Sequence, residues 1–501
     1  MSQETELKLT LNPAALEQLR AHPVLARAPL VGTPGVLENT YYDTPELQLK
    51  GQRMALRTRR DGDLLLQTVK CASASVGGLS ARPEWEKPFT GAFDFSDVDQ
   101  ASVRQLLDKL KPELVPVFTT HFERSTWALV PTPGVQILLM LDQGSIATQG
   151  RSQPLCEVEL ELVSGNPRDL YALALQLARD LPLQPEDVSK AQRGYRLFLG
   201  QAPKPQRARP SRLEANMSPV DAFRQIAFDC LAQWQGNASS ALESEDPEFI
   251  HQLRVALRRL RSALGLFEPA LPAEFVEDWT TQARTLAEEL GHARDLDVML
   301  AEILNPVLES GLADQGCERL AGLIREARER ARARALQILR QGRHGYPMLK
   351  LAAELHTLDS GNLDKSANLA TFARLQLKAL RKKARKRHAA ATGLEAERLH
   401  ALRVSLKRLR YGLEFLLPLI PEKPSVRYLK TLAEHQDGLG WLNDEAQARA
   451  QLRAWAGDDP ELRSGAAFVA GWHAPHMARL QRDILGQVAE DLWSKAPWRQ
   501  G

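Results

Sequence analysis

The chain of 501 residues has few cysteines, no long apolar run and no glycine-rich phosphate loop. Its four cysteines are scattered singly, at Cys71, Cys156, Cys230 and Cys317. Such spacing argues against a disulfide scaffold and against a structural zinc site. No stretch reaches the roughly 18 apolar residues of a membrane span. The pattern GxxxxGK[ST] is also missing, which argues against a conventional P-loop nucleotide hydrolase.

The N-terminal segment MSQETELKLTL has neither the basic start nor the apolar run of a secretory signal peptide. We therefore expect a cytoplasmic protein without a membrane partner. The aromatic side chains that stack on nucleic-acid bases are sparse in the basic helical part of the chain, which argues against nucleic acid as a partner.

The chain changes character at the segment QAPKPQRARPSR, which holds three prolines and no hydrophobic periodicity. Before it, short alternating segments separated by turn residues predict an antiparallel β domain. After it, long stretches with helical periodicity, such as 320–343 and 373–388, predict an all-α domain. We predict domains at 1–200 and 218–495, joined by a linker at 201–217. The first 200 residues carry 21 Lys and Arg against 24 Asp and Glu, and the rest 44 against 38.

Charged residues alternate with apolar ones along the predicted strands. Glu157, Glu159 and Glu161 share one face of a strand, and Val158 and Leu160 share the other. Such a face is ordinarily a solvated surface, but three carboxylates in a row repel one another unless cations lie among them. Carboxylate oxygens suit Mg²⁺ or Mn²⁺, and interspersed Arg and Lys suit phosphate oxygens. If the apolar faces pack against helices such as 166–181, the charged faces line the inside of a barrel.

An ordered set of charged motifs over residues 1–200 resembles the CYTH domain, the triphosphate tunnel metalloenzyme family. The set comprises Glu4-x-Glu6-x-Lys8, Arg57-x-Arg59, Lys70, Glu84-x-Glu86, Arg124, Asp142, the row from Glu157, and Ser189-Lys190-x-x-Arg193. The resemblance implies a closed tunnel of eight antiparallel strands, an α+β fold with outer helices, and metal-dependent hydrolysis or cyclisation of a triphosphate compound.

The resemblance also implies roles for individual residues. The implied metal ligands are Glu4, Glu6, Glu157, Glu159 and Glu161, with Glu4, Glu6 and Glu159 foremost. The implied triphosphate-binding residues are Lys8, Arg57, Arg59, Lys70, Arg124, Lys190 and Arg193. Glu84, Glu86 and Asp142 would orient these cations or a water. With Glu4, Glu6, Lys8 and Glu159 as the catalytic set, an acidic residue, helped by Lys8, would orient the attacking water.

The helical half contains an internal repeat. The segment HQLRVALRRLRSAL from His251 recurs as HALRVSLKRLRYGL from His400, an offset of 149 residues. A duplicated helical unit is the simplest account. His251, Arg254, Arg258 and Arg261 fall within about 80° of helix surface, and His400, Arg403, Lys407 and Arg410 repeat the pattern. Two such faces could be ordinary solvated surfaces, but repetition of the histidine with the cations favours an anion-binding pocket with a protonated histidine.

This half resembles the CHAD domain from about Ser218 to Leu492. The resemblance implies two pseudo-symmetric helical bundles that bind inorganic polyphosphate. Strict repetition fails where Lys407 replaces Arg258 and where Asn443 replaces Arg294. A further basic run, 381–387, either extends the binding groove or is a solvated helix face.

We therefore expect an enzyme that cleaves inorganic triphosphate to pyrophosphate and orthophosphate with Mg²⁺ or Mn²⁺, and whose helical half binds polyphosphate. Three alternatives stay open: a polyphosphate-binding adaptor with little turnover, a phosphatase for an organic triphosphate, and an adenylate cyclase. Tyr41, Tyr42 and Trp85 are the aromatic residues that could hold a nucleoside in the last case.

Overall fold

The computed structural model describes residues 2–71, 75–359, 368–494, 496 and 498. It comprises two compact units. The first runs from the N-terminus to Gln206 and also takes in Trp234–Ser244 and Ile338–Thr357. The second comprises Arg207–Gln233, Glu245–Gln337 and the chain from Leu358 onward. The bounds 1–200, 201–217 and 218–495 remain our proposal for the domains.

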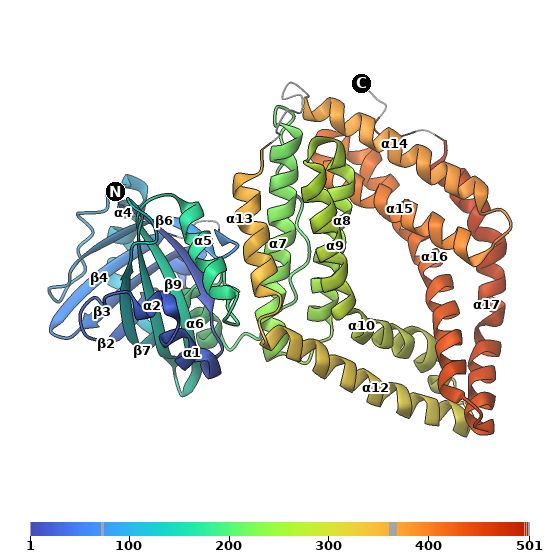
Figure 1. Cartoon of the computed structure of the whole chain (residues 1–501), viewed down its shortest axis with the longest axis horizontal. Coiled ribbons are helices and arrows are strands. Elements are labelled where there is room, and N and C mark those ends of the chain that lie inside the picture. Colours follow the sequence, from blue (N-terminus) through green and yellow to red (C-terminus); the bar gives the residue numbers. More distant parts are fainter. Residues whose placement is uncertain (1, 72–74, 360–367, 495, 497, 499–501) are drawn as a thin grey trace. The chain divides into compact units, whose positions relative to one another are not determined.

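The first unit is built around a closed ring of eight antiparallel strands, coloured blue to teal in Figure 1. Around the ring the order is β1, β9, β8, β7, β2, β3, β4 and β6, and β6 pairs with β1 to close it. The bounds are β1 Ser2–Thr10, β2 Gly35–Asp43, β3 Met54–Asp61, β4 Leu64–Cys71, β6 Leu79–Pro88, β7 Val115–Leu129, β8 Gln136–Thr148 and β9 Arg151–Ser164. Two short strands, β5 (Ser75–Val76) and β10 (Gln184–Pro185), pair with β6 and β1.

The alternating sequence gives each strand one charged and one apolar face. On β1 and β9, the apolar side chains Leu7, Leu9, Val158 and Leu160 are fully buried. The carboxylates of β9 have the opposite parity and so point into the ring. Helix α5 (Pro167–Ala178) packs against β9 and β1 and supplies an apolar cover for their outer faces.

The helices of the first unit close or flank the ring. Their bounds are η1 Pro13–Ala15, α1 Leu16–Arg20, α2 Pro23–Ala26, α3 Gln48–Gly51, α4 Ala101–Leu110, η2 Lys111–Glu113, α5 Pro167–Ala178 and α6 Lys190–Leu199. Helix α6 contacts β7, β8 and β9. It begins at a capping box in which the Ser189 hydroxyl accepts the Gln192 N–H and the Gln192 side chain accepts the Ser189 N–H. This cap fixes the start of α6 and with it the position of Lys190, the first residue of the helix, whose side chain extends into the ring.

Helix α13 (Gly345–Thr357) belongs to the first unit although it lies far along the chain. It packs against α5 and β10. The Gln184 amide donates to the Leu339 carbonyl at 2.6 Å, just before α13. A Cβ atom on Gly345 would lie 1.8 Å from the Leu183 carbonyl oxygen, so only glycine allows this approach.

The second unit contains the predicted repeat. The first copy has α7 (Pro219–Glu243), α8 (Glu248–Phe267), η3 (Glu268–Ala270), α9 (Ala273–Glu289), α10 (Gly291–Val298), the π-helix η4 (Met299–Leu304), α11 (Asn305–Glu309) and α12 (Gln315–Arg340). The second copy has α14 (Leu369–Ala390), α15 (Ala396–Leu416), η5 (Leu417–Leu419), α16 (Glu422–Ala456) and α17 (Pro460–Leu492). The ten residues of α7 from Trp234 onward are grouped with the first unit.

The two copies correspond element by element at the offset of 149. Helix α8 matches α15, the single turn η3 matches η5, and α12 matches α17. The stretch from α9 to α11 is broken by a π-helix, whereas its counterpart α16 is one continuous helix of 35 residues. Helix α13 has no counterpart among the described residues of the second copy, so it is an addition to the repeat.

The predicted fold class is therefore confirmed: a closed antiparallel barrel with outer helices, followed by an all-α part made of two related bundles. Within the part of the chain that the structure describes, no helix is both long and apolar enough to cross a membrane.

We expect a Gly345→Ala substitution to lower thermal stability. The added methyl group has to displace the Leu183 backbone, and overpacking of this kind costs about 1–3 kcal/mol. Thermal unfolding followed by circular dichroism measures the change. Gly322→Ala in α12 is the matched control, because a Cβ atom there meets nothing within 4 Å and alanine favours a helix. An unchanged melting temperature in the Gly345 variant would contradict the close packing of α13.

Candidate functional site

The interior of the strand ring is a cavity of about 730 Å³ lined by charged side chains of both signs. Twelve predicted site residues line it: Glu4, Glu6, Lys8, Arg57, Arg59, Lys70, Glu84, Glu86, Arg124, Glu159, Glu161 and Lys190. They come from β1, β3, β4, β6, β7, β9 and α6. Segments far apart in the sequence therefore supply one ionic interior.

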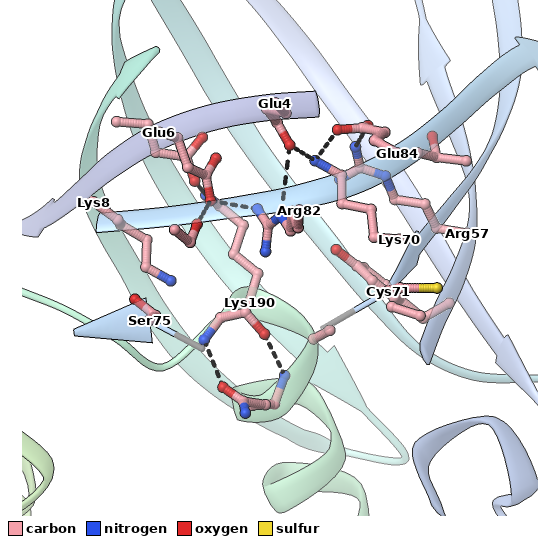
Figure 2. Close-up of a pocket in the computed structure, with 18 of the residues that line it drawn as sticks. Glu4, Glu6, Lys8, Arg57, Lys70, Cys71, Ser75, Arg82, Glu84 and Lys190 are labelled. Carbon is pink, nitrogen blue, oxygen red and sulfur yellow. Dashed lines mark hydrogen bonds and ion pairs between the residues drawn. The ribbon is translucent and has the colours of Figure 1, made fainter. Parts of the chain in front are cut away.

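One group of charges joins β1, β4 and β6 (Figure 2). Lys70 lies 2.9 Å from Glu4 and 2.6 Å from Glu84. Arg82 contacts both carboxylates of β1, at 3.5 Å from Glu4 and through a shorter contact to Glu6. Each cation thus bridges two carboxylates. Such a network holds the strand faces together, yet leaves its oxygens on the wall of the cavity.

A second group is centred on Lys190 at the start of α6. Its ammonium lies 2.8 Å from Asp142, 2.8 Å from Glu157 and 2.7 Å from Glu159. Burial alone would lower the pKa of Lys190, but attraction to these three carboxylates outweighs burial and holds its pKa well above the usual value. Lys190 is therefore a permanent cation.

Arg124 binds the same acidic group from β7. Its guanidinium forms two 2.7 Å hydrogen bonds to Asp142 and one of 2.8 Å to Glu159. Burial opposes ionisation of Glu159, yet Lys190 and Arg124 hold the pKa of Glu159 well below its usual value. Glu159 is thus ionised in the free protein and already has cationic partners.

Lys8 lies at a separate corner of the cavity. Its ammonium donates to the Val188 carbonyl at 2.5 Å. The neighbouring Glu186 and Asp187 line the cavity, and burial raises the pKa of both carboxyl groups. Asp187 accepts from the Ser75 hydroxyl at 2.7 Å and from the Gly78 N–H at 3.0 Å. A Cβ atom on Gly78, which has φ +81°, would lie 2.5 Å from the Lys8 carbonyl oxygen, so glycine is needed at this turn.

The opposite wall carries cations with spare donors. Arg57 lies 3.9 Å from Glu84, and its Nε and Nη2 atoms are buried without a hydrogen-bond partner among the described residues. Arg59 lies 3.9 Å from Glu86. Burial, together with repulsion from Arg57 and Arg124, lowers the pKa of Arg59 to about 10. Buried guanidinium donors without acceptors suit an anion with several oxygens.

The acidic residues also leave a place where added positive charge is favourable. Glu6 and Glu161 are directly opposed on β1 and β9. Burial, followed by repulsion from Glu4, raises the pKa of Glu161. Among the described residues, no three His, Cys, Asp or Glu side chains converge closely enough to enclose an ion. A divalent cation that shares its oxygen ligands with water and substrate phosphates fits such a carboxylate group.

Three predicted site residues lie behind the cavity wall. Asp142 and Glu157 are completely buried, and Arg193 bonds to Glu157 at 3.0 Å and to the Pro154 carbonyl at 2.6 Å. They position Lys190 and Arg124 instead of facing the cavity. Conversely, Arg82, Glu186 and Asp187 line the cavity without having been predicted. Arg82 shares the strand parity of Glu84 and Glu86, a signal that could have revealed it.

A second, smaller pocket of about 210 Å³ lies in the second unit. Four of the eight predicted polyphosphate-binding residues line it: His251, Arg254, Arg258 and Arg403. The pocket also contains Arg294, which was not predicted as a site residue, and the carboxylates Asp295, Glu302 and Asp444. It is thus cationic with an acidic rim, not purely basic.

The pocket follows the repeat. Arg254 lies 3.4 Å from Asp295 in the first copy, and Arg403 lies 3.7 Å from Asp444 in the second. The other members of the second motif lie elsewhere. His400 bonds to Asn443 at 3.0 Å, and Arg410 pairs with Glu414 at 2.8 Å. Arg261 also does not line the pocket.

The electrostatics of this pocket bear on the expected protonated histidine. Burial, followed by repulsion from Arg294, lowers the pKa of His251 to about 4. His251 is therefore neutral in the free protein at neutral pH, and a protonated His251 stays a prediction for the anion-bound state. Burial together with Arg403 and Arg258 lowers the pKa of Lys407 to about 7. Lys407 does not line the pocket itself, but an anion held by Arg258 and Arg403, the two guanidiniums that repel it, would favour the return of its proton.

Comparison with known families agrees with this division. The CYTH domain model matches residues 2–195, and the CHAD domain model matches residues 225–453. The chain therefore carries a CYTH domain followed by a CHAD domain, as the motifs predicted.

Particular relatives match each part. An inorganic triphosphatase of Haemophilus influenzae is 34% identical over 198 residues, which are 39% of this chain and 55% of that protein. The match thus spans about half the length of this relative. The crystal structure of the CHAD domain from the plant Ricinus communis has 33% identity and a TM-score of 0.50. It covers 59% of this chain and 98% of that one.

Replacing Lys190 by Met should destabilise the first unit. Asp142, Glu157 and Glu159 would keep their burial but lose their shared cation, which typically costs about 3–5 kcal/mol. The loss should shrink as pH falls from 8 to 5. Buried carboxylates with fewer cationic partners favour protonation, so part of the loss is relieved at lower pH. Denaturant unfolding at both pH values measures this. Lys190→Arg keeps the charge and is the control; an equal loss at both pH values would contradict the electrostatic cause.

Proposed function

We propose that the barrel hydrolyses inorganic triphosphate to pyrophosphate and orthophosphate with Mg²⁺ or Mn²⁺, and that the helical part binds inorganic polyphosphate. The proposal includes the predicted cytoplasmic location. The observation that carries it is the ionic interior of the ring, where cations with spare donors and carboxylates occupy one cavity. Similarity of this half of the chain to an inorganic triphosphatase supports the same reaction.

In this proposal the cations of the cavity hold the triphosphate. Arg57, Arg59 and Lys8 would bind its oxygens, with Lys70 and Arg124 beside them. Phosphoryl transfer spreads negative charge over the transferred oxygens, so fixed cations that need no rearrangement stabilise the transition state. The internal ion pairs provide much of this rigidity, because Lys70, Arg124 and Lys190 are already held by carboxylates in the free protein.

The metal site is proposed at Glu4, Glu6 and Glu161. When bound, a divalent ion would neutralise phosphate charge and lower the pKa of bound water. Glu159, a first choice from the sequence, also stays in this proposal, because Lys70 and Arg82 hold Glu4 and Glu6 as Lys190 and Arg124 hold Glu159. Glu157 is completely buried, and its part is to position Lys190. Glu84 and Glu86 orient Lys70, Arg57 and Arg59.

Inorganic triphosphate is favoured over a nucleotide by the aromatic residues. Tyr42 and Trp85 pack in the cluster around Phe95 and Leu107 and do not line the cavity. Tyr41 does line it, but its ring is stacked on Phe118 at 4.5 Å between centroids. Phe122 and Tyr195 also line the cavity, but Arg124 and Lys190 lie over the Phe122 ring, and Tyr195 packs against Phe118. The aromatic rings of the cavity thus already have partners, which disfavours a cyclase.

Polyphosphate binding is proposed at the pocket of α8, α10, α15 and α16. Arg254, Arg258, Arg294 and Arg403 supply bidentate donors for phosphate oxygens. Likeness to a solved CHAD domain supports the helical fold in which this pocket lies.

The decisive experiment measures orthophosphate release from inorganic triphosphate, ATP, thiamine triphosphate and long-chain polyphosphate, with and without Mg²⁺ or Mn²⁺. Cyclic AMP is assayed in parallel. Metal-dependent release from inorganic triphosphate in preference to the others supports the proposal. No turnover on any substrate, with tight polyphosphate binding, would instead identify an adaptor.

Glu6→Gln should reduce turnover of inorganic triphosphate about a hundredfold or more, because the variant loses a charged ligand of the proposed metal site. Steady-state phosphate release at several metal concentrations measures the effect. Glu38→Gln is the matched control, since Glu38 is an exposed residue of β2 outside the cavity lining. Full activity of the Glu6 variant would refute the metal-site assignment.

Polyphosphate affinity should fall about tenfold between pH 6 and pH 8. Lys407 lies outside the pocket lining but is repelled by Arg403 and Arg258, which do line it. Its lowered pKa, about 7, leaves it charged at pH 6 and mostly neutral at pH 8, where binding of an anion to these two arginines has to take up a proton. Titrations at both pH values measure this. The Lys407→Arg variant stays charged at both pH values, so its pH response shows the effect of ionisation of the ligand itself. If this variant and the wild type had the same pH response, Lys407 would not be its cause.

A further inference from the structure

Helix α14 carries an unusual concentration of positive charge outside the pocket. Its 22 residues include eight Lys or Arg and no Asp or Glu. None of these eight residues lines the pocket. A run of this kind is often only a solvated surface, so its placement and its partners decide whether it has a role.

Most of the cations lie on the side of α14 that faces solvent. The buried residues Leu369, Phe372, Ala373, Leu377 and Ala384 form another face, and only Lys383 and Arg387, near the C-terminal end, share its sector. The exposed cations are Arg374, Lys378, Lys382, Lys383, Arg385, Lys386 and Arg387. Arg381 differs, because its guanidinium bonds to the Leu492 carbonyl at 3.1 Å and anchors the helix to the end of α17.

No exposed cation of α14 forms an ion pair with a carboxylate of the described residues. Arg374, Lys378, Lys382 and Lys386 follow one another four residues apart, at a rise of about 6 Å per step. Like charges at this spacing destabilise a helix. Repulsion among these cations thus raises the free energy of the folded protein. An extended anion bound along the helix would reduce this repulsion.

The fold does not require this charge. The equivalent helix of the first copy, α7, contains one Arg and three acidic residues. Helix α12 is also rich in Arg, but Glu326 and Glu329 lie among its cations, and Arg330 pairs with Glu326 at 3.5 Å. A run of cations with no carboxylate among them is therefore a feature of α14 that α7 and α12 do not share.

We propose that the exposed face of α14, residues 374–387, is a second polyanion-binding surface that takes an extended chain of inorganic polyphosphate. This inference rests on the proposed polyphosphate binding and adds a surface that favours long chains over short ones. Of the two rings of α14, Phe372 is buried, and His388 packs edge-on against Trp493 and bonds to the Leu485 carbonyl, so the helix offers little on which a nucleic-acid base could stack. A uniform phosphate chain without bases fits such a surface.

The test uses the full chain with Lys378→Gln, Lys382→Gln and Lys386→Gln combined. Glutamine has a helix propensity close to that of lysine, and circular dichroism checks that the helices remain. The matched control combines Arg325→Gln, Arg330→Gln and Arg334→Gln, which removes the same charge from exposed positions of α12. Long-chain polyphosphate and triphosphate are titrated at several salt concentrations.

We expect the α14 variant to bind long-chain polyphosphate at least about tenfold more weakly, with a salt slope shallower by about 2 because three phosphate contacts are lost. Triphosphate hydrolysis should be unchanged, and the control should stay within about twofold of the wild type. Equal losses in both variants would mean that net charge alone acts and would overturn the proposal. Single-stranded RNA and anionic vesicles are titrated in parallel. An α14 variant that loses binding only to one of these, and not to polyphosphate, would also overturn the proposal.

A pocket variant, Arg254→Gln with Arg403→Gln, separates the two proposals. If this variant loses polyphosphate while the α14 variant binds like the wild type, the α14 surface is refuted and the pocket stands. If the wild type binds no polyphosphate, the proposed function of the helical part fails and the α14 surface fails with it.

Discussion

The structure of the barrel depends on one constraint: charges enclosed in a protein interior must be neutralised. A ring of eight strands closes on itself, so the charged faces of all its strands meet in one space. Isolated ions there would be very costly. Lys190, Arg124, Lys70 and Arg82 each contact two or more carboxylates and remove that cost. The interior can stay charged only because its charges are paired across strands.

This pairing also prepares the cavity for an ionic ligand. Side chains held by ion pairs lose little freedom when a phosphate chain binds, so less of the binding free energy is spent on ordering them. The pairing is incomplete in two places: Arg57 has donors without acceptors, and Glu161 opposes Glu6. An anion suits the first place and a cation the second. A triphosphate with its metal supplies both charges together.

The helical part uses charge differently. Its pocket is assembled by the repeat, through equivalent Arg–Asp pairs, but the two copies have diverged. Only the first copy contributes its histidine and Arg294 to the pocket, and α14 of the second copy carries basic charge that α7 lacks. The two copies are thus similar in their helices and in one Arg–Asp pair each, but they differ in the charges that they add around the pocket and on α14.

The sequence by itself determined the strand faces and the repeat. Period-two alternation located β1, β3, β4, β6, β8 and β9, because a strand that is buried on one side has apolar residues at every second position. Strands β2 and β7 were not singled out: β7 starts Val-Pro and both mix polar with aromatic residues, which weakens the pattern. Only the tertiary structure decided which carboxylates face the cavity. Glu157, Glu159 and Glu161 share a strand face, yet Lys190 from α6 buries the first and pairs with the second, while the third opposes Glu6. The burial and the pKa of each carboxylate are set by partners from distant segments of the chain. Alternation along one strand cannot predict which partners those are.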